Sequence, residues 1–392
     1  MRIQFDFCDM FLVCEIVRNR TSGGTEGKKT MRVPDYIAEI KAYPPGKPLE
    51  ELEREYGISD SIKLASNENP LGPSPKAVSA IMDRLGYLHR YPDGSGYYLI
   101  QRLAKKLRVL PDQVVLGNGS NEIIELLTRT CLEPGDEVIS PFPSFLMYGI
   151  IIQAAGCVNK VAPLKDLKND LEAMADLINS KTRMIFVNNP NNPTGTIVSR
   201  DSFERFLDRV PGDVIVAVDE AYIEFARKPD CPEGIDYLDS GKTVVTLRTF
   251  SKAYGLAGLR IGYGIMPADL ANYLNRVRQP FNTNALAQAG ALAALDDDEF
   301  FVKTLDLTQS GLKYLYGELD RLNIRYYPTE TNFFLIDVAV DAKSVYEKML
   351  RQGVIVRAMT AYGYPNYIRL TVGLPEENKR FVNALEKVLC ER

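Results

Sequence analysis

The chain has 392 residues, enough to bury a sizeable core and to divide into two domains. Its 47 basic and 51 acidic residues give a formal charge of −4, and no long basic run occurs, so nucleic-acid binding is disfavoured. No apolar stretch approaches the length needed to cross a bilayer. The composition therefore predicts a soluble, cytoplasmic globular protein.

Cysteine and histidine usage limits the chemistry further. The six cysteines are scattered without CxxC spacing, and the single histidine is His89. Neither a zinc site nor a disulfide framework is expected, and no metal is predicted. A hydrolase triad is disfavoured because no serine or cysteine stands out as a nucleophile for His89. We expect His89 to be structural.

The first thirty residues differ in pattern from the rest of the chain. Met1–Thr30 mixes apolar and acidic residues, and Asp6, Asp9 and Glu15 interrupt the apolar core that a secretory signal needs. Export is therefore not expected. Because a more regular pattern begins at Met31, residues 1–30 are interpreted as a disordered extension or as the result of a start site placed too early.

The next segment, residues 31–66, is expected to form an N-terminal arm and part of a small domain. Pro34–Ala42 is compatible with a short helix, which the prolines of Tyr43–Pro48 must end. A helix is predicted over Leu49–Tyr56 and a short strand over Ile62–Leu64. The adjoining loop, Ser66–Pro75, is rich in proline and polar residues, as loops at the mouth of a site often are.

From about residue 113, short apolar strands alternate with helical segments, which predicts an α/β domain with a mainly parallel sheet over residues 67–278. The expected strands are Val114–Leu116, Glu137–Ser140, Met184–Asn188, Val214–Val218 and Val244–Leu247. The expected helices are Glu122–Cys131, Phe145–Ala155, Leu171–Ile178 and Ser202–Val210. In such sheets ligands bind beyond the carboxyl ends of the strands, so the residues directly after each strand are the candidates for a site.

The first strand leads into Gly117–Glu122, in which two glycines precede a helix. The unpaired N–H groups of a helix start make a cradle for an anion. The segment also resembles the opening of a dinucleotide-binding motif. However, Glu122 occupies the third-glycine position, and Asp136 precedes the next strand instead of coming after it. A phosphate is therefore favoured over a nicotinamide cofactor.

Three further strand ends carry unusual residues. Pro141–Phe145 can lay the ring of Phe145 over a planar ligand, although core packing explains that ring equally well. Asn189–Gly195 contains more amides than a turn requires. Asp219 stands at the tip of an apolar strand, and a buried carboxylate needs a partner such as a cationic ring nitrogen.

One more strand end is followed by a candidate segment, Leu247–Arg260. It surrounds Lys252 with side chains that can donate hydrogen bonds to a phosphate, namely those of Thr249, Ser251 and Arg260. A lysine beside an anion site can act as a Schiff-base nucleophile; the alternative is a surface lysine in a loop. The strand ends together describe one ligand, pyridoxal phosphate. Its expected contacts are Ser120, Asn121, Thr249, Ser251 and Arg260 for the phosphate, Phe145 for the ring, Asp219 for the ring nitrogen, Asn192 and Tyr222 for the oxygen, and Lys252 for the aldehyde.

The segments SNENPLGPSP, RYPD, NNPTG, DEAYIEF and LRTFSKAYGLAGLR resemble the fold-type I pyridoxal-phosphate aminotransferases, and within them the histidinol-phosphate aminotransferase family. The resemblance covers roughly Met31 to the C-terminus. It implies that Lys252 holds the cofactor covalently and that Asp219 pairs with the pyridinium nitrogen. Phe145 stands where tyrosine is common, so stacking survives while a hydroxyl contact is lost. Asn121 stands where some members have aspartate.

The resemblance also implies an activity. The expected reaction interconverts L-histidinol phosphate and 2-oxoglutarate with imidazole-acetol phosphate and L-glutamate, in histidine biosynthesis, with Lys252 moving the proton from the substrate Cα. An aromatic amino-acid aminotransferase and a threonine-phosphate decarboxylase of the same family are alternatives. A non-catalytic protein that kept this fold is a third, which the intact set of Lys252, Asp219 and Arg260 disfavours.

The last third, residues 279–392, is expected to form a smaller α+β domain. The expected helices are Leu270–Arg278, which precedes it, Ala285–Leu295, Phe300–Leu322 and Asn378–Cys390, and the expected strands are Phe333–Asp337, Val354–Arg357 and Tyr367–Thr371. By resemblance, Arg357 and Arg369 bind the anionic end of the substrate, although each is also compatible with an ordinary salt bridge. The resemblance further implies a homodimer with shared sites, in which Tyr91 reaches the neighbour's cofactor phosphate and Tyr43 approaches its substrate.

Overall fold

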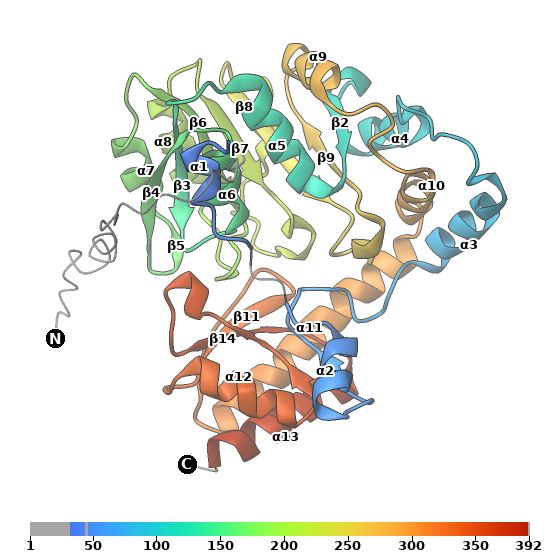
Figure 1. Ribbon diagram of the computed structural model, residues 1–392, viewed down its shortest axis with the longest axis vertical. Helices are drawn as coiled ribbons and strands as arrows, with labels where there is room; N and C mark the ends of the chain where they lie inside the picture. The colour runs from blue at the N-terminus through green and yellow to red at the C-terminus, as the bar shows by residue number, and fades with distance from the viewer. Residues whose placement is uncertain (1–31, 44–45, 391–392) are drawn as a thin grey trace, which may run out of the picture.

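The computed structural model describes residues 32–43 and 46–390, which form a large domain and a smaller one below it in Figure 1. The segment Met1–Thr30, for which an extension or a misplaced start was expected, lies outside the described residues. Within the described residues, no helix is both long and apolar enough to cross a membrane.

The large domain is built on an eight-stranded sheet with the order β2-β9-β8-β7-β6-β3-β4-β5. Its strands are β2 (Val114–Gly117), β3 (Glu137–Phe142), β4 (Val158–Lys165), β5 (Lys168–Asn169), β6 (Thr182–Asn188), β7 (Ile215–Asp219), β8 (Thr243–Thr249) and β9 (Gly262–Ile265). The pairs from β4 through β3, β6 and β7 to β8 are parallel, whereas β9 is antiparallel to both its neighbours and β5 is antiparallel to β4. The expected mainly parallel sheet is confirmed.

Helices cover both faces of this sheet, so its central strands are buried on both sides. Alternate residues of β7 point to opposite faces: Ala217 packs with α5, α6 and α9, while Val216 and Val218 pack with α7 and α8. These helices are α5 (Gly119–Cys131), α6 (Met147–Ala154), α7 (Leu171–Asp176), α8 (Arg200–Arg209) and α9 (Ala268–Val277). Each of the five was expected from the sequence, with ends that differ by a few residues.

Three more helices extend the large domain beside β2, namely α3 (Pro75–Arg84), α4 (Tyr97–Leu107) and α10 (Ala285–Ala294). Ala287 and Ala291 of α10 are buried in the same core as Leu99 and Leu103 of α4. Figure 1 shows this group at one side of the domain, away from α7 and α8.

The small domain contains an antiparallel sheet of order β10-β11-β14-β13. Its elements are α11 (Asp298–Arg321), β10 (Arg325–Tyr327), β11 (Phe333–Asp337), α12 (Ala342–Arg351), β12 (Val354–Ile355), β13 (Arg357–Ala358), β14 (Tyr367–Thr371) and α13 (Pro375–Cys390). The prediction of one continuous strand over Val354–Arg357 is wrong, because the segment forms two strands. It divides at Val356, because β12 pairs with β1 of the N-terminal arm while β13 pairs with β14.

The N-terminal arm links the two domains. Its elements are α1 (Asp35–Ala38), α2 (Leu49–Tyr56) and β1 (Ile62–Lys63). In α1, the Tyr36 carbonyl accepts a 3.0 Å hydrogen bond from Gln153 of the large domain, whereas Leu52 of α2 is buried against Leu350 and Ile355 of the small domain. The described residues of the arm therefore contact both domains.

The long helix α11 crosses between the two domains (Figure 1). Phe301 and Leu305 near its start pack in the core shared with α10, whereas Leu315 and Leu319 near its end lie in the core of the small domain. We therefore propose that the domain boundary lies within α11 and not at residue 279.

Candidate active site

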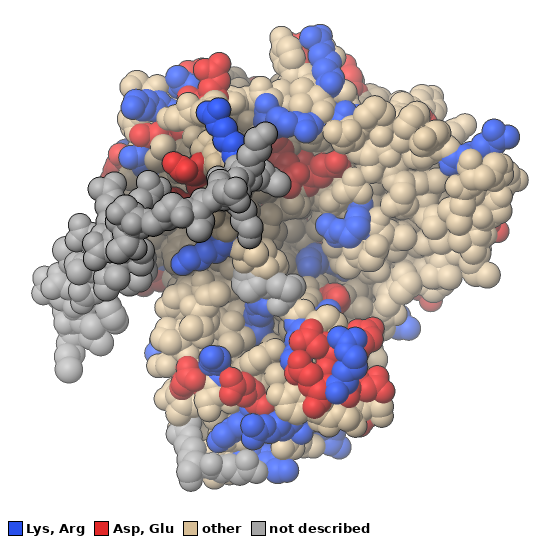
Figure 2. Space-filling model, viewed as in Figure 1, with Lys and Arg blue, Asp and Glu red and all other residues tan. Residues whose placement is uncertain are grey.

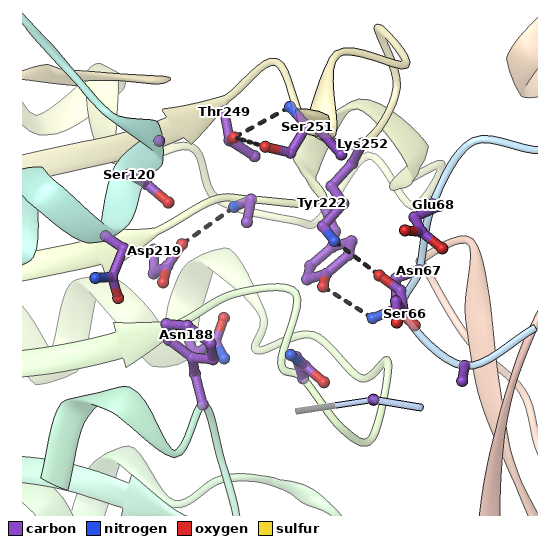
Figure 3. Close-up of a pocket in the computed structure, with 18 of the residues that line it drawn as sticks. Ser66, Asn67, Glu68, Ser120, Asn188, Asp219, Tyr222, Thr249, Ser251 and Lys252 are labelled. Atoms are coloured by element: carbon purple, nitrogen blue, oxygen red, sulfur yellow. Dashed lines mark hydrogen bonds between the residues drawn. The ribbon is translucent and has the colours of Figure 1, made fainter. Parts of the chain in front are cut away.

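A pocket lies at the carboxyl ends of the parallel strands, between the two domains (Figure 3). On the face shown in Figure 2 the surface is hollowed between the domains, and basic side chains lie at this hollow. The sequence-predicted residues that line the pocket are Tyr43, Ser120, Asn121, Phe145, Asn192, Asp219, Tyr222, Thr249, Ser251, Lys252, Arg260, Arg357 and Arg369. They come from segments more than 300 residues apart in the chain, which the fold brings together.

One end of the pocket is a cradle of hydrogen-bond donors. The Thr249 hydroxyl donates to Ser251 Oγ at 3.0 Å, and Arg260 Nη1 donates to the same oxygen at 3.4 Å. Helix α5 begins here at Gly119, and its first N–H groups lack partners within the helix. Donors and the positive end of the helix dipole thus converge, which suits a phosphate.

Close backbone packing holds this cradle together. A Cβ added to Gly262 on β9 would lie 2.5 Å from the Ser120 nitrogen, and one added to Gly119 would lie 2.7 Å from Arg260 Nη2. Gly119 also has a φ of +71°, which side-chain-bearing residues rarely adopt. Both positions therefore require glycine for the helix start to approach β9 and Arg260.

Asp219 ends β7 and is buried, with 3% of its surface exposed. Its Oδ2 accepts a 2.7 Å hydrogen bond from the Tyr148 hydroxyl, and its Oδ1 accepts from the Ala221 N–H at 3.3 Å. Burial raises the pKa of Asp219 to about 6, while the hydrogen bond from Tyr148 opposes this rise. A cationic group in the pocket would compensate the buried charge.

Lys252 lies just after β8 and points toward the arm (Figure 3). Its Nζ donates to the Ser66 carbonyl oxygen at 3.1 Å and lies 5.6 Å from the centre of the Tyr222 ring. Burial lowers the pKa of Lys252 to about 8, and the positive charge of Arg369 contributes in the same direction. The amine is therefore more often neutral near physiological pH than an exposed lysine, and the neutral amine is the nucleophile.

The opposite end of the pocket carries two arginines. Arg357 and Arg369 face each other in the register of β13 and β14. Arg369 donates to Asn192 Oδ1 at 2.5 Å and to the Ala65 carbonyl at 2.7 Å, and its Nε has no hydrogen-bond partner within the described chain. A buried guanidinium with an unused donor beside a pocket is suited to an anionic ligand.

Tyr91 is the predicted site residue that does not line this pocket. Its side chain is 83% exposed and stacks on Phe281 with ring centres 4.8 Å apart. Tyr87, Leu88 and Tyr98 nearby in the chain are also largely exposed, and Tyr87 and Tyr98 line a second hollow together with Tyr91. A role for Tyr91 in the pocket of its own chain is not compatible with this position.

Several pocket residues were missed from the sequence. Ser66, Asn67 and Glu68 line the pocket, although the loop that contains them was expected only in general terms to lie at a site mouth. Asn188 also lines it, and Tyr148 supports Asp219 from α6. The run of polar residues at 66–69 was a usable signal for the first three, whereas nothing in the sequence around Tyr148 marked it.

The residues of the pocket fit pyridoxal phosphate. The donor cradle fits the phosphate, the buried and uncompensated Asp219 fits a protonated ring nitrogen, and Lys252 with its lowered pKa fits the aldehyde. Within the described residues, no group of histidine, cysteine, aspartate or glutamate side chains is arranged to hold a metal ion.

Comparisons with known proteins show the family of the chain. The family model for aminotransferase class I and II matches residues 59–385. The histidinol-phosphate aminotransferase of Desulfotalea psychrophila is 52% identical over 362 residues, which is 92% of this chain and 96% of that protein. A histidinol-phosphate aminotransferase 2 of Pseudomonas fluorescens is 47% identical and covers 90% of this chain and 96% of its own length.

Solved structures show the same fold. The crystal structure of the histidinol-phosphate aminotransferase from Sinorhizobium meliloti in complex with pyridoxal-5'-phosphate matches with a TM-score of 0.86 at 25% identity, over 93% of this chain and 99% of that one. The aspartate aminotransferase of Thermus thermophilus with maleate matches with a TM-score of 0.80 at 22% identity, over 92% of this chain and all of that one. The fold is thus that of a class I and II aminotransferase. Within that class, the chain belongs to the histidinol-phosphate aminotransferase family.

Proposed function

We propose that the chain uses pyridoxal phosphate to transfer an amino group between L-histidinol phosphate and 2-oxoglutarate, giving imidazole-acetol phosphate and L-glutamate, as a step of histidine biosynthesis in the cytoplasm. The observation that carries the proposal is the convergence of Lys252, Asp219 and the donor cradle on one pocket whose other end holds Arg357 and Arg369. One site thus provides for both a phosphorylated cofactor and an anionic substrate.

The bound cofactor would supply an electron sink for the carbanion formed at the substrate Cα. Asp219 would keep the ring nitrogen protonated, because an ionised carboxylate in a buried site strongly favours a neighbouring positive charge. Asn192 and Tyr222 would hold the phenolic oxygen, and Phe145 would lie against the ring. Ser120, Asn121, Thr249, Ser251 and Arg260 would hold the phosphate.

Lys252 would have two tasks. Its neutral amine would attach to the aldehyde, and after the substrate amine displaces it, the freed amine would move the proton from the substrate Cα. The lowered pKa of about 8 supports both tasks, since each requires an amine that can lose its proton near neutral pH.

Arg357 and Arg369 would bind the anionic end of either substrate, the phosphate of histidinol phosphate or a carboxylate of glutamate. Their facing positions on β13 and β14 support this, because two planar donor groups can adapt to anions of different shape. Tyr43 lines the pocket of its own chain from the N-terminal arm, so it would approach the substrate there and not, as the resemblance implied, in the neighbouring subunit.

The proposal includes a homodimer with shared sites. Tyr91 would reach the cofactor phosphate of the partner, which is consistent with its exposed position outside the pocket of its own chain. The exposed apolar side chains around it support burial against a second copy, since contiguous apolar patches on soluble proteins commonly mark interfaces.

A substrate panel tests the function. The purified protein, loaded with pyridoxal phosphate, is offered histidinol phosphate, phenylalanine or O-phosphothreonine, with 2-oxoglutarate as amino acceptor. We expect histidinol phosphate to give the highest kcat/KM and no carbon dioxide to be released. Negligible turnover of histidinol phosphate would overturn the assignment. Faster turnover of phenylalanine would indicate an aromatic aminotransferase, and carbon dioxide from O-phosphothreonine would indicate the decarboxylase.

A further inference from the structure

Asn67 has no role in the proposed function, yet it is one of the most buried polar residues of the pocket wall, with 1% of its surface exposed. Its Nδ2 donates a 2.9 Å hydrogen bond to the Tyr222 hydroxyl oxygen, and its Oδ1 accepts a 3.1 Å hydrogen bond from Thr371 Oγ1. Its backbone N–H donates to the same Thr371 oxygen at 3.0 Å, and its carbonyl accepts from Asn332 Nδ2 at 3.2 Å. Asn67 thus connects Tyr222 of the large domain to β14 of the small domain.

These contacts are consistent with one orientation of the Asn67 amide. Thr371 Oγ1 already accepts the backbone N–H of Asn67, so its single hydrogen is free to be donated to Asn67 Oδ1. Donation of that hydrogen fits the orientation in the structure, in which the amide oxygen faces Thr371 and the NH2 group faces Tyr222. The assignment of the amide oxygen and nitrogen thus agrees with the hydrogen-bond network.

The orientation has a consequence for Tyr222. An amide NH2 group can only donate, so the Tyr222 oxygen accepts, and its own hydrogen cannot be directed at Asn67. Tyr222 lines the pocket beside Lys252 (Figure 3), so its hydrogen is available to an acceptor there. We propose that Asn67 is a positioning residue that directs the Tyr222 hydroxyl proton into the pocket, toward an anionic oxygen. This inference rests on the proposed function, in which that oxygen belongs to the cofactor.

The backbone offers a second reason for asparagine at this position. Asn67 has a φ of +55°, a conformation that asparagine and aspartate adopt more readily than most residues. A purely conformational role would therefore be served by aspartate as well. Asn67→Asp keeps the size and the backbone preference but replaces the donor facing Tyr222 with an acceptor, so it separates the two roles.

The test is a pH titration of the visible absorbance of the full chain loaded with pyridoxal phosphate, which reports the pKa of the lysine-linked cofactor. In Asn67→Asp the carboxylate would draw the Tyr222 proton away from the cofactor oxygen. The anionic oxygen would lose its donor, and we expect the absorbance pKa to rise by about one unit or more. Tyr222→Phe removes the same donor and should raise the absorbance pKa in the same direction.

The double variant decides whether Asn67 acts through Tyr222. In the Tyr222→Phe background, Asn67→Asp should shift the absorbance pKa by much less than it does in the wild-type background. An equal shift in both backgrounds would mean that the new charge acts directly on the cofactor, and it would overturn the proposal. An unchanged pKa in Asn67→Asp would also overturn it and would leave only the conformational role.

A second variant covers the case in which Asn67→Asp does not fold. Thr371→Val is close to isosteric and uncharged, and it releases the amide oxygen of Asn67 from its donor. We expect a smaller rise of the absorbance pKa that disappears in the Tyr222→Phe background; no rise would count against the proposal. Failure of the wild-type protein to bind pyridoxal phosphate would instead defeat the proposed function, so the two failures are distinguishable.

Discussion

The Tyr148 hydroxyl donates a 2.7 Å hydrogen bond to Asp219 Oδ2, which joins α6 to the end of β7 beneath the pocket. The tyrosine is itself held in place, because its ring is parallel to that of Phe186 with the centres 4.6 Å apart. This bond opposes the rise in the pKa of Asp219 that burial causes, and that pKa stays at about 6. The carboxylate therefore remains ionised at neutral pH, as the proposed pairing with a cationic ring requires.

Tyr148→Phe should weaken cofactor binding in a pH-dependent manner. Loss of the donor raises the pKa of Asp219 above 6, so a larger fraction of the carboxyl is protonated and cannot pair with the ring nitrogen. A rise of about one unit in this pKa would raise the Kd for pyridoxal phosphate by roughly fivefold to tenfold near pH 6, with a smaller increase in the Kd near pH 8.5. Cofactor titrations with absorbance detection at several pH values measure this. A loss of equal size at all pH values would contradict it.

Asp219→Asn should stabilise the cofactor-free protein at neutral and alkaline pH. The pKa of Asp219 in the folded state, about 6, lies above the unfolded value, so the folded state binds more protons between the two values. The stability of the wild type therefore falls as pH rises through this window. At pH 8 the variant should be more stable by on the order of 1–3 kcal/mol, and the difference should vanish below about pH 4.

Urea unfolding of both cofactor-free proteins at pH 8 and pH 4 measures this difference. With pyridoxal phosphate added, the order should reverse, because the wild type gains more from ligand binding. Equal stability of the two cofactor-free proteins at pH 8 would show that the charge of Asp219 is already compensated in the folded protein.

Much of this site could be predicted because its residues lie at the ends of strands with a clear pattern. The ends of β6, β7 and β8 were expected within a few residues, and these ends place Asp219 and Lys252. Contacts between distant segments could not be predicted in the same way. Tyr148 lies 71 residues from Asp219, and Asn67 lies 155 residues from Tyr222. No local sequence pattern indicates a contact between residues so far apart in the chain.

Short strands that depend on a partner were also missed. β9 has only four residues and contains two glycines, which gives little local preference for a strand. It forms because Gly262 allows the start of α5 to pack against it, as the 2.5 Å approach of an added Cβ to the Ser120 nitrogen indicates. The division of the expected strand Val354–Arg357 has a similar origin, since β12 and β13 find partners in different sheets.

The attachment of pyridoxal phosphate to the cofactor-free protein should depend on the protonation of Lys252. Because the neutral amine reacts, the rate of attachment should rise with pH and level off above about pH 8, more than two units lower than for an ordinary lysine. Stopped-flow absorbance at low cofactor concentration measures the rate. Lys252→Ala should show no attachment, and borohydride should trap no cofactor on it. A rate that continues to rise beyond pH 10 would contradict the lowered pKa.

Arg369→Gln should affect both substrate binding and Lys252. Removing this guanidinium takes away a positive charge that lowers the pKa of Lys252, so the pH profile of attachment should move to higher pH. The variant also loses a guanidinium that can donate two hydrogen bonds to one anion. We therefore expect kcat/KM to fall on the order of 10²-fold for histidinol phosphate and for glutamate. Steady-state kinetics with both substrates provides the measurement. Arg357→Gln serves as the comparison, since Arg369 is the charge that lowers the pKa of Lys252 most.

Hybrid dimers should reveal whether Tyr91 serves the neighbouring subunit. In a hybrid of one Lys252→Ala chain and one Tyr91→Ala chain, a shared arrangement puts both lesions in one site and leaves the other site intact. The hybrid should therefore regain about half of the wild-type activity, although each parent variant is impaired. Differently tagged chains, refolded together and purified through both tags, provide the hybrid for assay. If Tyr91 served its own chain, neither site would be intact, and the activity of the hybrid would not exceed that of the Tyr91→Ala parent.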